Sequence, residues 1–317
     1  MTPSVDLIIF VLLGVALLVG ALASLFLILV RITARGEALP LEERRPVPWG
    51  GAATAGLIVL SIVITFAAPV IGLQAGVQLP QAPPVNASEL ERIDSAEPSS
   101  KSAILDPEDF STLLLIDTAS KLTFAVVAVA LLVFLTGASA TDLGFSTKGA
   151  HRDLIYGLVA FGAVLLPIIG INVTLNLIFD PQNEHPILAM LKNGTPPTHV
   201  WLTSILAAVM VAPVVEEFVF RGIFQGYLEK RFGSESWTPI LVSSVCFAAV
   251  HYNGDSPAPI PLFFFALALG YLYRQTHRLW SCIVLHFCLN AMSIIVMWML
   301  AQHPELTEPA TIFSWLR

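Results

Sequence analysis

Apolar residues along the chain gather into long runs that shorter polar segments separate. A run of roughly 18 residues or more with almost no charge is typical of a transmembrane helix, which satisfies its backbone polar groups internally. We expect a helix in each of eight apolar runs, at approximately 7–30, 51–73, 119–137, 153–179, 199–224, 238–252, 259–276 and 279–301. The pattern therefore predicts an all-α polytopic membrane protein with about eight transmembrane helices.

One long polar segment divides these helices into two groups. Residues 81–111 are rich in Pro, Ser, Asp and Glu, a composition that favours an extramembrane linker with little packed structure. We therefore expect an N-terminal transmembrane hairpin at 1–80, a six-helix domain at 112–301 and a short tail at 302–317.

Composition and charge agree with a membrane location. The chain is 56% hydrophobic and only 12% charged, about half the charged share of a soluble domain. The net charge of −7 comes without a basic stripe, so we expect membrane lipid and no nucleic acid as a partner. The odd-numbered connectors are the more basic ones, as in the four arginines between residues 31 and 45. This alternation places those connectors in the cytosol and both termini outside, as in a bacterial inner-membrane protein. The oligomeric state does not follow from the sequence.

Three ionisable residues interrupt the apolar run at 199–224, namely Glu216, Glu217 and Arg221. A charge near the bilayer centre costs about 2.5–3.5 kcal/mol, so we expect these groups to face a cavity or one another. Glu217 and Arg221 are four residues apart and can pair on one helix face. Glu216 is rotated by about 100° from Glu217, which leaves its carboxylate free for chemistry.

Two further polar pairs lie in later runs. Phe247 and His251 are four residues apart, as are His286 and Asn290, so each pair lies on one helix face. Counted from the turn between the two helices, Glu216 and His251 lie at nearly equal distances. An antiparallel hairpin therefore brings them to the same height.

These residues suit hydrolysis of an amide bond without a Ser or Cys nucleophile. Glu216 would act as general base on a water that His251 helps to hold. His286 and Asn290 would donate hydrogen bonds to the developing oxyanion. Glu216, His251 and His286 could instead bind a catalytic zinc ion, although the HExxH motif is absent. Spacing alone leaves both versions open, and no cofactor is firmly predicted.

Two alternatives come from other classes of protein. Glu216, His251 and His286 could form the proton relay of a proton-coupled transporter. We find no repeated halves of the kind that transporters often contain. A non-catalytic immunity or scaffold protein is the other alternative.

Three short motifs follow one another on later helices: EExxxR at 216–221, FxxxH at 247–251 and HxxxN at 286–290. In this order they resemble the motifs of the CPBP family, the CAAX prenyl endopeptidases and bacteriocin-processing or immunity proteins also called Abi. The resemblance has its motif core at about 199–295. It implies a six-helix CAAX-protease-like core and an intramembrane endopeptidase that cleaves membrane-associated or prenylated peptides, with its site open to the cytosol.

The resemblance also implies roles for individual residues. The catalytic set that it implies is Glu216, His251, His286 and Asn290, with Glu217, Arg221 and Phe247 in support. The family is often labelled a metalloprotease, whereas its eukaryotic CAAX members look like glutamate-dependent proteases. We favour the glutamate mechanism because the residues need no metal for it.

Another ionisable pair lies near the start of the third apolar run. Asp117 and Lys121 are four residues apart, and we expect a local ion pair in which the lysine extends along the helix toward the membrane surface. A role in substrate entry is the alternative.

Overall fold

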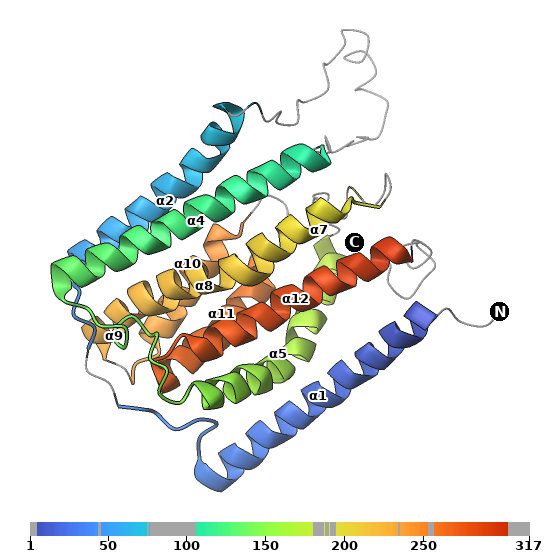
Figure 1. Cartoon of the computed structure of the whole chain (residues 1–317). Helices are drawn as coiled ribbons and strands as arrows, with labels where there is room; N and C mark the ends of the chain where they lie inside the picture. Colours follow the sequence, from blue (N-terminus) through green and yellow to red (C-terminus); the bar gives the residue numbers. More distant parts are fainter. Residues whose placement is uncertain are drawn as a thin grey trace.

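The computed structural model is a bundle of helices (Figure 1). It describes residues 5–43, 46–74, 76, 106–179, 187, 190, 195–233, 235–252 and 257–303, without the side chains of 5–10, 68 and 176. The elements in chain order are α1 (Val5–Arg35), α2 (Gly51–Gln74), α4 (Pro107–Thr136), α5 (Ala150–Phe179), α7 (Thr198–Ser204), the π-helix η1 (Ile205–Val211), α8 (Ala212–Glu217), the π-helix η2 (Phe218–Gln225), α9 (Gly226–Phe232), α10 (Thr238–Val250), α11 (Pro259–Thr276) and α12 (Trp280–Gln302). These ranges contain no strand.

Six helices within the described ranges are long and apolar enough to cross a membrane. They are α1, α2, α4, α5, the continuous run from α7 to α9 and α12. The other two predicted runs are helices as well. However, the 13 residues of α10 extend only about 20 Å, less than the roughly 30 Å hydrocarbon core, and α11 ends in the polar residues Arg274, Gln275 and Thr276. The prediction of an all-α polytopic membrane fold is confirmed.

The two N-terminal helices lie on opposite sides of the bundle (Figure 1). Helix α1 packs along α5, and α2 packs along α4. The sequence predicts a hairpin at 1–80, but the structure separates the two helices. The connector between Arg35 and Gly51 can reach about 50 Å when extended, which is enough to cross the end of the bundle. Each N-terminal helix therefore buries one apolar side against a different core helix.

Helix α4 begins twelve residues before the run predicted at 119–137. Asp106 caps its N-terminus, because the side-chain carboxylate accepts a hydrogen bond from the backbone N–H of Glu108 at 2.9 Å. The last residues of the segment predicted as a linker at 81–111 are therefore helical. The part of that segment at 81–105 lies outside the described residues.

Helices α5 and α12 approach closely at Gly157. A Cβ atom built there would lie 2.6 Å from Val284 Cβ and 2.7 Å from the carbonyl oxygen of Ser281. We expect Gly157→Ala to lower the free energy of unfolding by about 1–3 kcal/mol, because backbone on α12 would have to move. Thermal unfolding in detergent measures the loss. Gly170→Ala is the matched control, since a Cβ at this other α5 glycine meets nothing within 4 Å; equal losses in the two variants would contradict the expectation.

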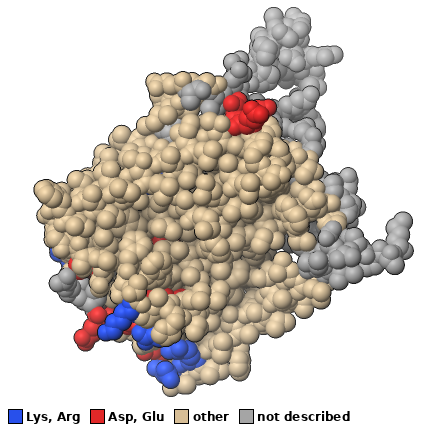
Figure 2. All heavy atoms as spheres, in the orientation of Figure 1, with Lys and Arg blue, Asp and Glu red and all other residues tan. Residues whose placement is uncertain are grey.

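Polar side chains fasten the connector between α1 and α2 to one end of the bundle. Lys230 Nζ donates to the carbonyl oxygens of Val47 at 2.9 Å and Trp49 at 2.8 Å. Gln275 Nε2 donates to the carbonyl oxygen of Leu39 at 2.6 Å. Lysine and arginine side chains gather at this end of the molecule (Figure 2).

An arginine in the α11–α12 connector completes this attachment. Arg278 donates from Nε and Nη2 to the two carboxylate oxygens of the fully buried Asp153, at 2.6 and 2.8 Å. It also binds the carboxylate of Glu42 from the α1–α2 connector. These hydrogen bonds raise the pKa of Arg278 above its ordinary value, with Asp153 as the main cause. The hydrogen bond from Arg278 lowers the pKa of Glu42, so both charges are stabilised in the folded state.

Candidate active site

Three helical segments bring the predicted site residues together around α8. Helix α8 ends at Glu216 and Glu217, between the two π-helices, and it contacts both α4 and α12. Glu216 Oε2 lies 3.7 Å from His251 Nε2, at the C-terminus of α10, and 4.0 Å from His286 Nε2, in α12. Residues that are far apart in the sequence thus meet at one carboxylate.

Glu217 is a structural anchor beneath this meeting point. Its side chain is fully buried, and its Oε1 accepts from Arg221 Nη1 at 3.3 Å and from His286 Nδ1 at 2.8 Å. Arg221 is also fully buried and donates from Nη2 to the carbonyl oxygen of Ala266 in α11 at 3.2 Å. Breaking such a buried pair leaves an uncompensated charge, so Glu217 and Arg221 fix α8 and α11 to the histidine of α12.

Both histidines are oriented by acceptors at Nδ1. Helix α10 ends in a tight turn in which the N–H of His251 bonds to the carbonyl oxygen of Ala248, and the carbonyl oxygen of Phe247 lies 2.7 Å from His251 Nδ1. For His286, the acceptor at Nδ1 is the carboxylate of Glu217. Each Nδ1 faces an acceptor, so each ring turns its Nε2 toward Glu216.

Phe247 supports both rings and the arginine at once. Its fully buried ring lies 4.6 Å from the ring of His251 and 5.9 Å from that of His286, between centroids. The guanidinium carbon of Arg221 lies 4.6 Å from the centroid of the same ring, which is within the range of a cation–π interaction. The first position of the FxxxH motif is therefore the packing centre of the site.

Asn290 makes a hydrogen bond that the sequence pattern did not predict. Its Nδ2 donates to the carbonyl oxygen of Ala208 in η1 at 2.7 Å. In a regular α-helix the carbonyl oxygen of Ala208 would accept from the N–H of Ala212, but in the π-helix that N–H bonds to the carbonyl oxygen of Ala207. The next residue, Pro213, has no N–H to offer, so the carbonyl of Ala208 needs another donor. One amide hydrogen of Asn290 therefore holds η1 against α12.

Glu216 has a neighbour that the three motifs do not contain. Lys121 Nζ, from α4, lies 3.8 Å from Glu216 Oε1 and 2.9 Å from Asp117 Oδ2. The expected local pair with Asp117 is present, and the lysine also reaches the site. The sequence gives one signal for this role, a lysine in the middle of an apolar helix.

The spacing of Glu216 and the two histidines differs from that of zinc ligands. Ligands of a tetrahedral zinc ion lie about 3.3 Å apart, whereas Glu216 Oε2 is 3.7 and 4.0 Å from the two Nε2 atoms. Lys121 places a competing cation beside the same carboxylate. Among the residues that the structure describes, no group of three or more His, Cys, Asp or Glu is arranged to hold a metal. In this arrangement the Glu216 carboxylate therefore lies farther from both histidines than zinc ligands lie from one another.

An apolar helical bundle that encloses glutamate, histidine and arginine side chains belongs to the class of integral membrane proteins with a buried polar site. Residues 198–292 match the family model described as Type II CAAX prenyl endopeptidase Rce1-like. This segment contains all three motifs and runs from α7 into α12, while α1 to α5 lie outside it. Neither the curated proteins nor the solved structures contain a match to the chain. The predicted resemblance to the CPBP family is confirmed over this segment, which supports a peptidase.

Proposed function

We propose that this protein is a glutamate-dependent intramembrane endopeptidase that cleaves membrane-associated or prenylated peptides. The observation that carries the proposal is the position of Glu216 Oε2 opposite the Nε2 atoms of two histidines, at 3.7 and 4.0 Å. These separations are too long for direct hydrogen bonds and short enough for one water to bridge. Such a water can donate one hydrogen to Glu216 and the other to His251.

The reaction then needs only this water and the peptide bond. The water oxygen attacks the scissile carbonyl carbon while Glu216 takes its proton. An Nε2–H of His286 and the second N–H of Asn290 donate to the oxyanion. When the C–N bond breaks, Glu216 returns the proton to the leaving amine. One water and one amide give one carboxylic acid and one amine, and Glu216 is regenerated.

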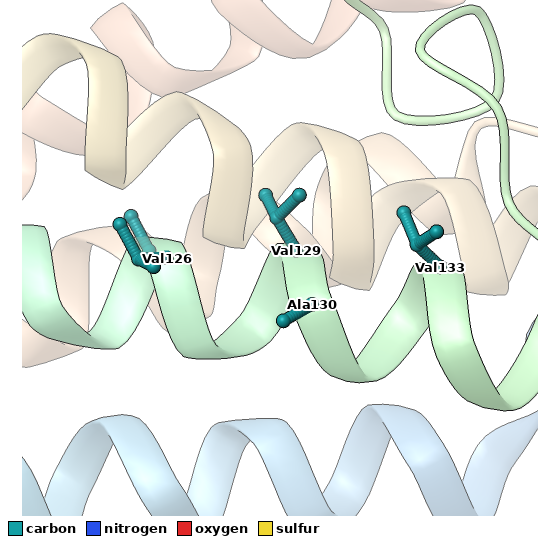
Figure 3. Close-up of a pocket in the computed structure, with 5 residues that line it drawn as sticks. Val126, Val129, Ala130 and Val133 are labelled. Carbon is teal, nitrogen blue, oxygen red and sulfur yellow. The ribbon is translucent and has the colours of Figure 1, made fainter.

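Two features support a membrane-bound substrate. The side chain of Glu216 is 18% accessible whereas Glu217 is fully buried, so the reactive carboxylate is the one that a substrate can approach. An open apolar groove of about 540 Å³ runs along α4, lined by Ala125, Val126, Val129, Ala130 and Val133 (Figure 3). Ala125 follows Lys121 by one helical turn, so this groove begins close to the site and offers a surface for an apolar chain.

The basic end of the bundle supports an orientation with this end in the cytosol. Helix α9, which contains Lys230, and the α11–α12 connector, which contains Arg278, lie at the end opposite to the first residues of α1 and the last residues of α12 (Figure 1). Under the positive-inside rule this end faces the cytosol, and both termini lie outside a membrane such as the bacterial inner membrane.

A single assay in oriented vesicles tests the proposal. A panel of quenched lipid-anchored and CAAX-type peptides is added to inverted and to right-side-out vesicles, with and without a strong zinc chelator. We expect cleavage in inverted vesicles only, unchanged by the chelator. Loss on chelation with recovery on adding zinc would refute the metal-free mechanism. Cleavage in right-side-out vesicles alone would refute the orientation, and no cleavage in either would favour the transporter or scaffold alternatives.

A further inference from the structure

The two adjacent carboxylates of the site each face a cation of their own. Glu217 pairs with Arg221, four residues later in the same helical run, at 3.3 Å. Glu216 faces Lys121 at 3.8 Å, and this lysine comes from α4. The EExxxR motif thus supplies one cation for two carboxylates, and a helix outside residues 198–292 supplies the other.

Pairing with Asp117 alone does not explain the position of Lys121. It is the one basic residue in the sequence of α4, and it lies 14 residues from Pro107 and 15 from Thr136, near the centre of the helix, where a charge is most costly. An ion pair that served only itself could be replaced by apolar residues at little cost. Lys121 instead reaches the carboxylate of another helix, while Asp117 balances its charge at 2.9 Å.

The contact divides the two oxygens of Glu216 between different partners. Oε1 faces the ammonium group of Lys121, and Oε2 faces the Nε2 atoms of His251 and His286. The terminal torsion of a glutamate is broad and roughly two-fold, so an unrestrained carboxylate exchanges its oxygens and tilts. A cation on one side fixes the plane of the group and leaves the other oxygen toward the histidines.

We propose that Lys121 is a positioning residue of the active site, which holds Oε1 of Glu216 so that Oε2 meets the reacting water. The catalytic consequence rests on the proposed peptidase function, while the contact itself does not. It follows that the functional unit includes α4 and is larger than the segment that carries the three motifs.

The kinetic test compares Lys121→Met, which keeps the length of the side chain, with Lys121→Arg, which keeps the charge. We expect Lys121→Met to lower kcat roughly 10- to 100-fold with KM changed less than about threefold, because a misplaced base slows chemistry more than binding. Lys121→Arg should recover a large part of kcat. The matched control is Lys148→Met, since Lys148 is an exposed lysine in the α4–α5 connector, and it should leave kcat unchanged. An unchanged kcat in Lys121→Met would overturn the proposal.

A second test does not depend on activity. Thermal unfolding in detergent is measured for Lys121→Met, Glu216→Gln and the double variant. We expect the loss in melting temperature caused by Lys121→Met to shrink when Glu216 is already neutral, because no carboxylate is then left without its cation. Strictly additive losses would refute the contact. If the wild type cleaves no peptide, the proposed function fails, and this cycle still decides whether Lys121 holds Glu216.

Discussion

Glu216→Gln is expected to lower kcat by about 10²–10⁴ while the protein stays folded. Glutamine keeps the size of the side chain but cannot accept the proton of the water, and general-base catalysis contributes a factor of this order. The fold should tolerate the change, because the buried contacts belong to Glu217 and Arg221, and Lys121 keeps Asp117 as a partner at 2.9 Å. Product formation by mass spectrometry gives kcat, and thermal unfolding in the same detergent gives stability.

The control for this variant is Glu37→Gln. Glu37 is exposed in the α1–α2 connector, so it removes the same charge far from the site and should leave kcat within about twofold. If Glu216→Gln kept more than a tenth of the wild-type kcat, Glu216 would not be the base. Glu217→Gln should lower the melting temperature as well as kcat, because it removes the carboxylate that accepts hydrogen bonds from both His286 and Arg221.

Arg278→Met is expected to destabilise the fold by about 3–5 kcal/mol, the usual cost of leaving a buried charge without its partner. Asp153 is fully buried and receives two hydrogen bonds from Arg278, at 2.6 and 2.8 Å. Glu42 would also lose the group that lowers its pKa. Chemical or thermal unfolding in detergent measures the loss, with the α1–α2 connector expected to detach first.

Two further variants identify the cause of that loss. Arg152→Met removes a neighbouring arginine that is half exposed and lies 3.7 Å from Glu42, so the expected change is below about 1 kcal/mol. Asp153→Asn combined with Arg278→Met should recover much of the stability, since the unpaired carboxylate is gone. Equal losses of unfolding free energy for Arg152→Met and Arg278→Met would show that the buried pair of Arg278 and Asp153 stabilises the fold no more than the exposed contact of Arg152.

Helical periodicity was enough to anticipate much of the site. The four-residue spacing of Glu217 and Arg221 predicts a pair, and the structure has it at 3.3 Å. Equal distances from the turn predict that Glu216 and His251 meet, and they lie 3.7 Å apart. These relations depend on one helix or one hairpin, where the geometry follows from local chain structure.

Other features depend on tertiary packing and could not be predicted in this way. The reach of Lys121 to Glu216 follows from the packing of α4 on α8, which no spacing within one helix reveals. The bond from Asn290 to Ala208 exists because η1 is a π-helix, whereas the sequence pattern assumes regular α-helix. The separation of α1 from α2 reflects which core helices offer apolar surface, and a hydropathy pattern does not identify partners.

The attachment of the α1–α2 connector has a consequence for how the chain is made. Glu42 and its partner Arg278 are 236 residues apart in the sequence, so at 5–20 residues per second the ribosome needs about 10–50 s to pass from one to the other. During that time the first helices are already synthesised, and the Asp153 carboxylate has not yet met its guanidinium. The contacts of Lys230 with this connector can form first, but the buried carboxylate of Asp153 is paired only after the connector before α12 has emerged. Late synthesis of one arginine thus makes completion of this attachment one of the last steps of assembly.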